Sequence, residues 1–140
     1  MTGVSIEPAL VDDLPAVMDL LERNRLPQEG LSEHVETTLV ARQQKRVVGS
    51  VALELYGGSA LLRSLVAEES LRGRGIGSNL IEAALSLARE RGVLTVYLLA
   101  ETAMEFFPRF GFKLTSRSRV PLAVRQSVEF THVCPASARV

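Results

Sequence analysis

The 140-residue chain has little of several features that define other classes of protein. Its one cysteine, Cys134, excludes an internal disulfide framework and a four-cysteine zinc site. Its 16 basic and 16 acidic residues give a formal net charge of zero, so no overall charge draws it to nucleic acid or to an anionic membrane. No apolar run approaches the roughly 20 residues that span a bilayer. What remains is a chain long enough for a single domain, residues 1–140, whose core needs no covalent or metal staple.

The first residues also lack the features of an export signal. The segment Met1–Leu10 has neither a positively charged start nor a long apolar stretch. The chain has 46% hydrophobic and 23% charged residues, which is typical of a globular domain. We therefore expect a cytoplasmic protein with no membrane and no nucleic-acid partner.

The hydrophobic pattern predicts an α/β domain with a mixed, mostly antiparallel central sheet flanked by helices. The expected elements are a strand over Val4–Ile6, a helix starting at Asp12–Pro15, a short helix or loop over Leu31–Val35, strands over Thr38–Ala41, Val47–Leu55 and Ala60–Ala67, a helix over Asn79–Arg91, a strand over Val93–Ala100 and a short helix over Ala103–Arg109. Two closing strands are expected over Phe112–Ser116 and Ser127–Val133, with a turn or helical segment over Pro121–Gln126 between them. The apolar run Val93–Ala100 is typical of a strand covered on both faces.

The most informative segment is a glycine-rich turn between a strand and a helix, Arg72–Ser78 (RGRGIGS). Backbone N–H groups at a helix start lack partners within the helix and lie at the positive end of its dipole. Glycines let such a backbone approach a large anion closely. Arg72 and Arg74 would add charge-assisted contacts to phosphates. The turn is therefore a candidate site for a pyrophosphate.

Three phosphate-binding motifs compete for this turn. The P-loop requires a lysine, which the turn lacks. The dinucleotide fingerprint fits Gly73 and Gly75, but Ser78 stands at its third glycine and no acidic residue follows over Arg91–Ala100. The pattern [QR]-x-x-G-x-[GA] of acetyl-CoA-dependent acyltransferases matches Arg72–Gly77 at every fixed position. A turn that merely packs a helix on a sheet is the remaining alternative.

From Val4 to about Val133, the chain resembles the GCN5-related N-acetyltransferase (GNAT) superfamily in the order of its elements. The resemblance also rests on Leu65–Ala67 before the turn and on Ala103–Phe112, which is similar to the family's A-x-x-F-Y-x-x-x-G-F signature. The chain resembles in particular the acetyltransferases encoded with arsenic-resistance genes, and more weakly the glutamate N-acetyltransferases. That closer likeness is carried by Leu61–Leu65, Phe106–Phe107, Val120–Pro121, Ser127–Phe130 and Cys134–Ala138.

The resemblance implies acetyl-CoA as cosubstrate and CoA as product. The strand before the turn would splay from its neighbour, and the backbone N–H of Leu65 would bind the acetyl carbonyl as an oxyanion donor. Ala67 would pair with the pantetheine arm, and the amides of the turn would hold the pyrophosphate. The implied cofactor-binding residues are Leu65, Val66, Ala67, Arg72, Gly73, Arg74, Gly75, Ile76, Gly77 and Ser78.

Two positions depart from the pattern of the family. Leu61 stands where the family often has a glutamate base, so Glu54 on the preceding strand is the candidate base, acting through a water, unless it is exposed or ion-paired. Phe107 stands where the family has a tyrosine acid. Tyr97 is available as a donor, or is a residue of the core. Water can serve as the acid for the leaving thiolate, because free thiol pKa values lie near 8.5.

Arg63 and Ser64 are candidates for binding the acceptor. A guanidinium suits a carboxylate or another oxyanion. On a regular strand the two side chains point to opposite faces, so one of them at most would face the substrate. A position on a solvated face is the alternative for Arg63. The loop over Leu26–Leu31 is expected to wall the acceptor site, since loops carry specificity on such scaffolds.

The remaining thiol and imidazole groups indicate no metal site. Cys134 alone is a poor chelator of trivalent arsenic and is interpreted as a small buried hydrophobe. His34, His132 and Cys134 are too sparse for a zinc site. His34 is interpreted as a surface or capping residue and His132 as a strand residue.

The sequence therefore favours an acetyl-CoA-dependent N-acetyltransferase that acts by direct attack of a small amine, an amino acid or an amino-acid-like toxic analogue. A protein-directed acetyltransferase and a non-catalytic acyl-CoA-binding or sensing module are the alternatives, and Leu61 and Phe107 keep the second one open. A nucleotide-binding module is the weakest alternative. Because the family is frequently dimeric, the resemblance also raises the option of a homodimer.

Overall fold

The computed structural model describes residues 3–127 except 72, 74, 100–105, 114 and 116. In this part of the chain, strands form one sheet in the order β1-β2-β3-β4-β5. The strands are β1 (Val4–Pro8), β2 (Thr38–Gln43), β3 (Arg46–Tyr56), β4 (Ser59–Ala67) and β5 (Thr95–Leu98). Neighbouring strands from β1 to β4 pair antiparallel, and β4 pairs with β5 in parallel. The predicted mixed, mostly antiparallel sheet is thereby confirmed.

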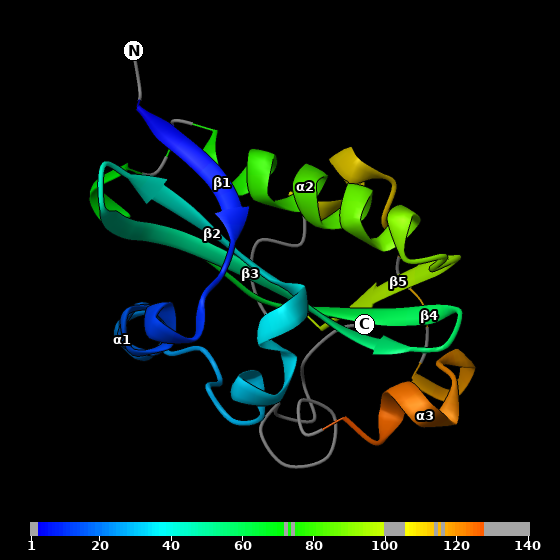
Figure 1. Ribbon diagram of the computed structural model, residues 1–140. Helices are drawn as coiled ribbons and strands as arrows, with labels where there is room; N and C mark the ends of the chain where they lie inside the picture. The colour runs from blue at the N-terminus through cyan, green and yellow to red at the C-terminus, as the bar shows by residue number, and fades with distance from the viewer. Residues whose placement is uncertain are drawn as a thin grey trace.

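Helices cover both faces of this sheet (Figure 1). The longest, α2 (Ile76–Glu90), lies across one face, and α1 (Leu14–Arg23) and the 3-10 helix η2 (Leu31–Thr37) lie on the other. The short α3 (Leu122–Arg125) packs against β4. The other 3-10 turns are η1 (Val11–Asp13), η3 (Glu69–Leu71), η4 (Phe107–Phe110) and η5 (Arg117–Arg119).

The alternation of side chains along β3 and β4 separates the core into layers. Leu53 and Leu62 belong to the cluster packed under α2. Ala52 belongs to the cluster under α1, and Leu61 to a smaller cluster under α3. Cross-strand partners point to the same face of a sheet. Glu54, which pairs with Leu61, therefore lies on the face of α1 and α3, between these two clusters.

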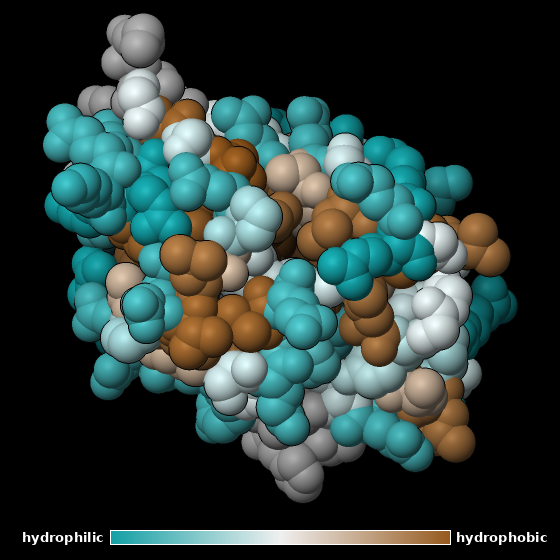
Figure 2. Space-filling model, in the orientation of Figure 1, coloured by the Kyte–Doolittle hydropathy of each residue, from teal (hydrophilic) through white to brown (hydrophobic). Residues whose placement is uncertain are grey.

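The surface of the described part is largely polar. Teal hydrophilic residues cover most of the face in Figure 2, with brown apolar residues between them. Its exposed large apolar side chains are those of Leu10, Val11, Leu94 and Leu122. Within the described ranges, no helix combines the length and the apolar character needed to cross a membrane.

Three predicted elements differ from the structure. Helix α2 begins at Ile76 rather than at Asn79, because the left-handed Gly75 ends the turn directly before it. Strand β5 is shorter than Val93–Ala100 and is only partly buried, since it borders the described sheet at its edge. The described residues of 112–116 form no strand, because the chain leaves η4 through the left-handed Gly111 and Phe112 packs back onto Phe107.

The other predicted elements of the C-terminal part agree with the structure where their residues are described. The turn or helical segment predicted over Pro121–Gln126 contains α3. The short helix predicted over Ala103–Arg109 overlaps η4, although residues 103–105 lie outside the described residues. Residues 128–133 of the last predicted strand also lie outside them.

Candidate functional site

Strand β4 contains a bulge just before the glycine turn. The register with β3 shifts there, so that Ser64 and Leu65 together lie opposite Val51. Ser64 has a φ of +59°, a left-handed conformation that is strained for a residue other than glycine. Its carbonyl accepts a hydrogen bond of 2.7 Å from the hydroxyl of Ser50, which stabilises the bulge. The irregularity thus falls at Leu65, the predicted oxyanion donor.

The pairing of β4 with β5 ends at Leu62, shortly before this bulge. Their parallel register ends at the pair Leu62 and Leu98, where β5 ends, whereas β4 continues to Ala67. Residues 63–67 of β4 therefore have no partner in β5 within the described part of the chain. A strand edge without a partner offers N–H and C=O groups to an extended ligand. The resemblance implies that the strands splay here and that Leu65–Ala67 line the opening, and both stay predictions.

The glycine turn joins this opening to the start of α2. Gly73 and Gly75 have φ values of +87° and +80°, and Gly75 is the residue that caps the helix. A Cβ built on either glycine meets no described heavy atom within 4 Å. Gly73 and Gly75 therefore leave space among the described residues for the predicted pyrophosphate at a helix start. Ile76 is buried, and the contacts predicted for Ile76–Ser78 stay predictions. Arg72 and Arg74 lie outside the described residues, so their contacts stay predictions.

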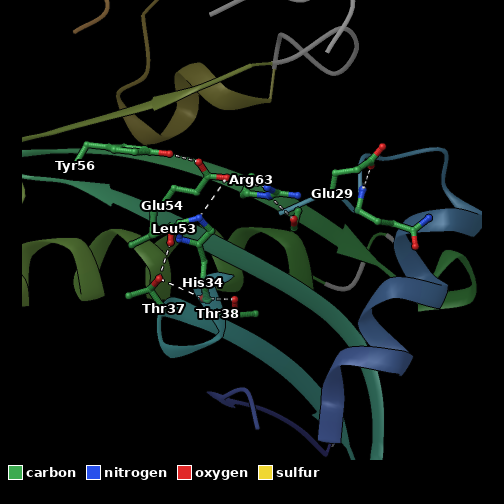
Figure 3. Close-up of polar contacts among 10 residues, drawn as sticks. Glu29, His34, Thr37, Thr38, Leu53, Glu54, Tyr56 and Arg63 are labelled. Carbon is green, nitrogen blue, oxygen red and sulfur yellow. Dashed lines mark hydrogen bonds and ion pairs between the residues drawn. The ribbon is translucent and has the colours of Figure 1, made fainter. Parts of the chain in front are cut away.

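Glu54 and Arg63 form a buried ion pair on the α1 face of the sheet (Figure 3). Nη1 of Arg63 donates to Oε2 of Glu54 at 2.7 Å, and the two side chains are 0% and 1% exposed, respectively. The hydroxyl of Tyr56 donates to Oε1, and Ser127 also hydrogen-bonds the carboxylate. Burial raises the pKa of Glu54, but the hydrogen bonds of Ser127, Tyr56 and Arg63 outweigh it and hold the pKa below its usual value. Glu54 is thus ion-paired rather than exposed, and it carries its charge at neutral pH.

The bulge brings Arg63 and Ser64 together, which contradicts the prediction that they point to opposite faces. Nε of Arg63 donates to Oγ of Ser64 at 3.0 Å, because the left-handed backbone of Ser64 breaks the alternation of the strand. Arg63 is also buried rather than on a solvated face. Its guanidinium therefore connects Glu54 to the residue that precedes Leu65.

His34 belongs to this site, although the sequence analysis placed it on the surface or at a cap. Its Nε2 lies 3.9 Å from Oε2 of Glu54, and its side chain is 25% exposed. Figure 3 shows the imidazole pointing from η2 toward Glu54. The hydroxyl of Thr38 donates to the His34 carbonyl at 2.8 Å, and that of Thr37 donates to the carbonyl of Leu53. Only the packing of η2 on β3 brings His34 here, so hydrophobic periodicity gave no signal for it.

Phe107 and Tyr97 pack against the core, whereas Tyr56 lies beside Glu54 in the site. Phe107 makes edge contacts with Phe106 and Phe112 and packs against the cluster under α2. Tyr97 packs beside Leu61 under α3. Burial and the hydrogen bond to Glu54 raise the pKa of Tyr56, a residue the sequence analysis did not single out, to about 12.

That high pKa keeps the Tyr56 hydroxyl protonated at neutral pH, so it remains a donor to Glu54. The predictions for His132 and Cys134 concern residues outside the described part.

Comparisons with known proteins agree with this geometry. Residues 34–114 match a family model described as acetyltransferase (GNAT) domain. An uncharacterized N-acetyltransferase of Chlorobaculum tepidum is 34% identical over 94 residues, which cover 66% of this chain and 60% of that protein. The chain thus spans about three fifths of the length of that relative.

Solved structures also share the fold. Rv2747 from Mycobacterium tuberculosis, in complex with CoA and NLQ, is 25% identical with a TM-score of 0.75, covering 86% of this chain and 78% of that one. N-acetylglutamate synthase from Neisseria gonorrhoeae, complexed with coenzyme A and N-acetyl-glutamate, is 21% identical with a TM-score of 0.82. The match covers 97% of this chain and 34% of that one. The second likeness is one of fold alone.

Proposed function

Given that the chain belongs to the GNAT acetyltransferase family, we propose that it transfers the acetyl group of acetyl-CoA to the amine of a small molecule. The observation that carries this proposal is the end of the β4–β5 pairing at Leu62, followed by the bulge at Ser64 and Leu65 and the helix start at Gly75. The unpaired edge of β4 suits the extended thioester arm. The N–H groups at the start of α2 suit its pyrophosphate.

In this proposal the acetyl group passes directly to the amine. The reaction needs a neutral amine, a donor for the oxyanion and an exit for the thiolate. The backbone N–H of Leu65 donates to the oxyanion, and Glu54 supplies the negative charge that draws a proton from the amine. The thiolate leaves with water as its acid, which agrees with the absence of a proton donor at Phe107.

The proposed acceptor is an amino acid or an amino-acid-like toxic analogue. Arg63 and Ser64 directly precede Leu65 and are the proposed binding residues for a carboxylate or another oxyanion of the acceptor. Because Arg63 is buried and paired with Glu54, this contact requires the ion pair to open when the acceptor binds. The structures with CoA and NLQ and with coenzyme A and N-acetyl-glutamate support small acceptors on this fold. The likeness to acetyltransferases encoded with arsenic-resistance genes supports the toxic analogue. A cytoplasmic location and a homodimer remain part of this proposal.

Substitution of the helix-capping glycine tests the cofactor site. Gly75→Glu places a bulky carboxylate where the pyrophosphate would lie, so calorimetry should detect no binding of acetyl-CoA. Gly92→Glu is the matched control, because Gly92 has a φ of +76° and equally open surroundings at the other end of α2. The control should bind acetyl-CoA like the wild type. Equal affinity in the Gly75→Glu variant would rule out this site.

A further inference from the structure

We propose that His34 takes the proton from the ammonium group of the acceptor, with the buried carboxylate of Glu54 beside its imidazole. The inference rests on the proposed acetyl transfer and adds the route of the proton. In the sequence analysis Glu54 is the candidate base, acting through a water. In this inference His34 is the base, and Glu54 is the charged group beside it.

The side chain of His34 is more exposed to solvent than those of Glu54 and Arg63 behind it. The carboxylate of Glu54 and the guanidinium of Arg63 are sealed from solvent, whereas a quarter of the His34 side chain is exposed. Glu54 already accepts hydrogen bonds from Arg63, Tyr56 and Ser127, so its oxygens are largely occupied. An amine therefore reaches the imidazole without breaking the buried network, but reaches the carboxylate only by disrupting it.

The backbone holds the imidazole in place. His34 interrupts η2 with φ −123° and ψ 26°, and its carbonyl accepts the hydrogen bond of Thr38. The hydroxyl of Thr37 fixes the same turn to β3. A neutral imidazole has one donor and one acceptor nitrogen. The acceptor nitrogen of the neutral imidazole is the one that would take the proton.

The proton and electron balance is complete without a further reactant. The ammonium gives one proton to the acceptor nitrogen of His34 and becomes a neutral amine. Its lone pair forms the C–N bond to the acetyl carbon, and the oxyanion is held by the N–H of Leu65. Collapse breaks the C–S bond, and the sulfur leaves with the electron pair. The thiolate takes up the second proton of the nitrogen, through water, and the imidazolium returns its proton to solvent.

Charged groups from several elements face or flank His34. Glu54 and the protonated Tyr56 lie on β3, and Arg63 lies on β4. On η2 itself, Glu33 and Glu36 are exposed. The carboxylate of Glu54 is the charged group that lies 3.9 Å from Nε2 of the imidazole in the described part.

The test compares His34→Gln with Glu36→Gln, a control on the same 3-10 helix, by CoA thiol release as a function of pH. Acetyl-CoA affinity is measured for both by calorimetry. General acid–base catalysis contributes about 10²–10⁴-fold, so kcat should fall by roughly 100-fold in His34→Gln at pH 7, with acetyl-CoA affinity unchanged. The deficit should shrink as pH rises, because the amine then arrives already neutral. Added imidazole should partly restore the turnover of His34→Ala, but not that of Glu54→Gln.

The outcomes separate this inference from the proposed function. If the wild type releases thiol with an amine and His34→Gln matches it at every pH, the role of His34 is wrong and the acetyltransferase proposal stands. A deficit independent of pH and unmoved by imidazole would make His34 a binding residue and would also overturn the inference. If the folded wild type releases no thiol with any amine, the proposed function fails, and the inference fails with it.

Discussion

At the scale of the residue, the buried pair of Glu54 and Arg63 determines what the site can do. Each charge is compensated by the other and by hydrogen bonds, so neither pays the full penalty of burial. The pair also links the bulge at Leu65 to the imidazole of His34. Its removal should therefore affect both stability and turnover, by separable mechanisms.

Glu54→Gln removes the negative charge and leaves Arg63 buried without a counter-charge. We expect the free energy of unfolding to fall by about 3–5 kcal/mol, the usual cost of breaking a buried ion pair. Urea unfolding at pH 7 measures this loss. Turnover should fall at least tenfold, while the acetyl-CoA affinity of the folded fraction should change little.

The double variant Glu54→Gln/Arg63→Met separates the two effects. It removes both buried charges, and the amide oxygen that replaces the carboxylate can still accept hydrogen bonds from Tyr56 and Ser127. Most of the lost unfolding free energy should therefore return, with turnover still low. Recovery of turnover together with stability would show that Glu54 has a structural role alone.

At the scale of the element, close packing of β3 on β4 shapes the opening for the cofactor. A Cβ on Gly49 of β3 would lie 2.9 Å from the carbonyl oxygen of Val66, next to the bulge. Because that oxygen belongs to the backbone, the strands themselves would have to separate. Position 49 therefore requires a glycine, because the backbone of β4 leaves no room for a side chain there.

Gly49→Ala should lower the free energy of unfolding by about 1–3 kcal/mol, the typical cost of overpacking. It should also weaken acetyl-CoA binding, because the edge of β4 moves. Thermal melting and calorimetry measure the two effects. Gly58→Ala is the control: its Cβ would approach Leu94 no closer than 4.0 Å. Equal melting temperatures for both variants would contradict this account of β3 and β4.

A second contact between elements fastens η1 to β2 through Asp13 and Arg42. The carboxylate of Asp13 accepts hydrogen bonds of 3.1 and 2.9 Å from the guanidinium, and one of 2.8 Å from the backbone N–H of Leu10. The bonds with Arg42 outweigh burial and hold the pKa of Asp13 below its ordinary value of 3.8. Because the folded pKa is the lower one, the contact stabilises the fold above pH 3.8 and loses its effect as pH falls through the folded pKa.

Asp13→Asn should therefore cost roughly 1–3 kcal/mol at pH 7. Its difference from the wild type should narrow as pH falls below 3.8. Urea unfolding at neutral and acidic pH measures this. The exposed pair of Asp19 and Arg23 provides a control, and Asp19→Asn should have little effect at either pH. A difference for Asp13→Asn that stays constant with pH would contradict the assignment.

At the scale of the whole molecule, local patterns predict the sheet better than the site. Alternation along β2, β3 and β4 predicts the architecture, and the glycine turn before α2 gives a candidate place for the cofactor, because these features are local. The bulge at Ser64 is set by its register against β3, and the position of His34 by the packing of η2 on β3. Neither has a local signature, which is why the sequence left the position of Arg63 open and gave no sign that His34 lies beside Glu54.

The most direct test of the account is thiol release from acetyl-CoA with a panel of amines. The panel contains free amino acids, their phosphinic and arsinic analogues, polyamines and peptide N-termini. The account predicts release with amino acids or their analogues and none with peptides. Release with peptides alone would indicate a protein-directed enzyme. Folded protein that binds acetyl-CoA but releases no thiol with any amine would contradict the central claim and indicate an acyl-CoA-binding module.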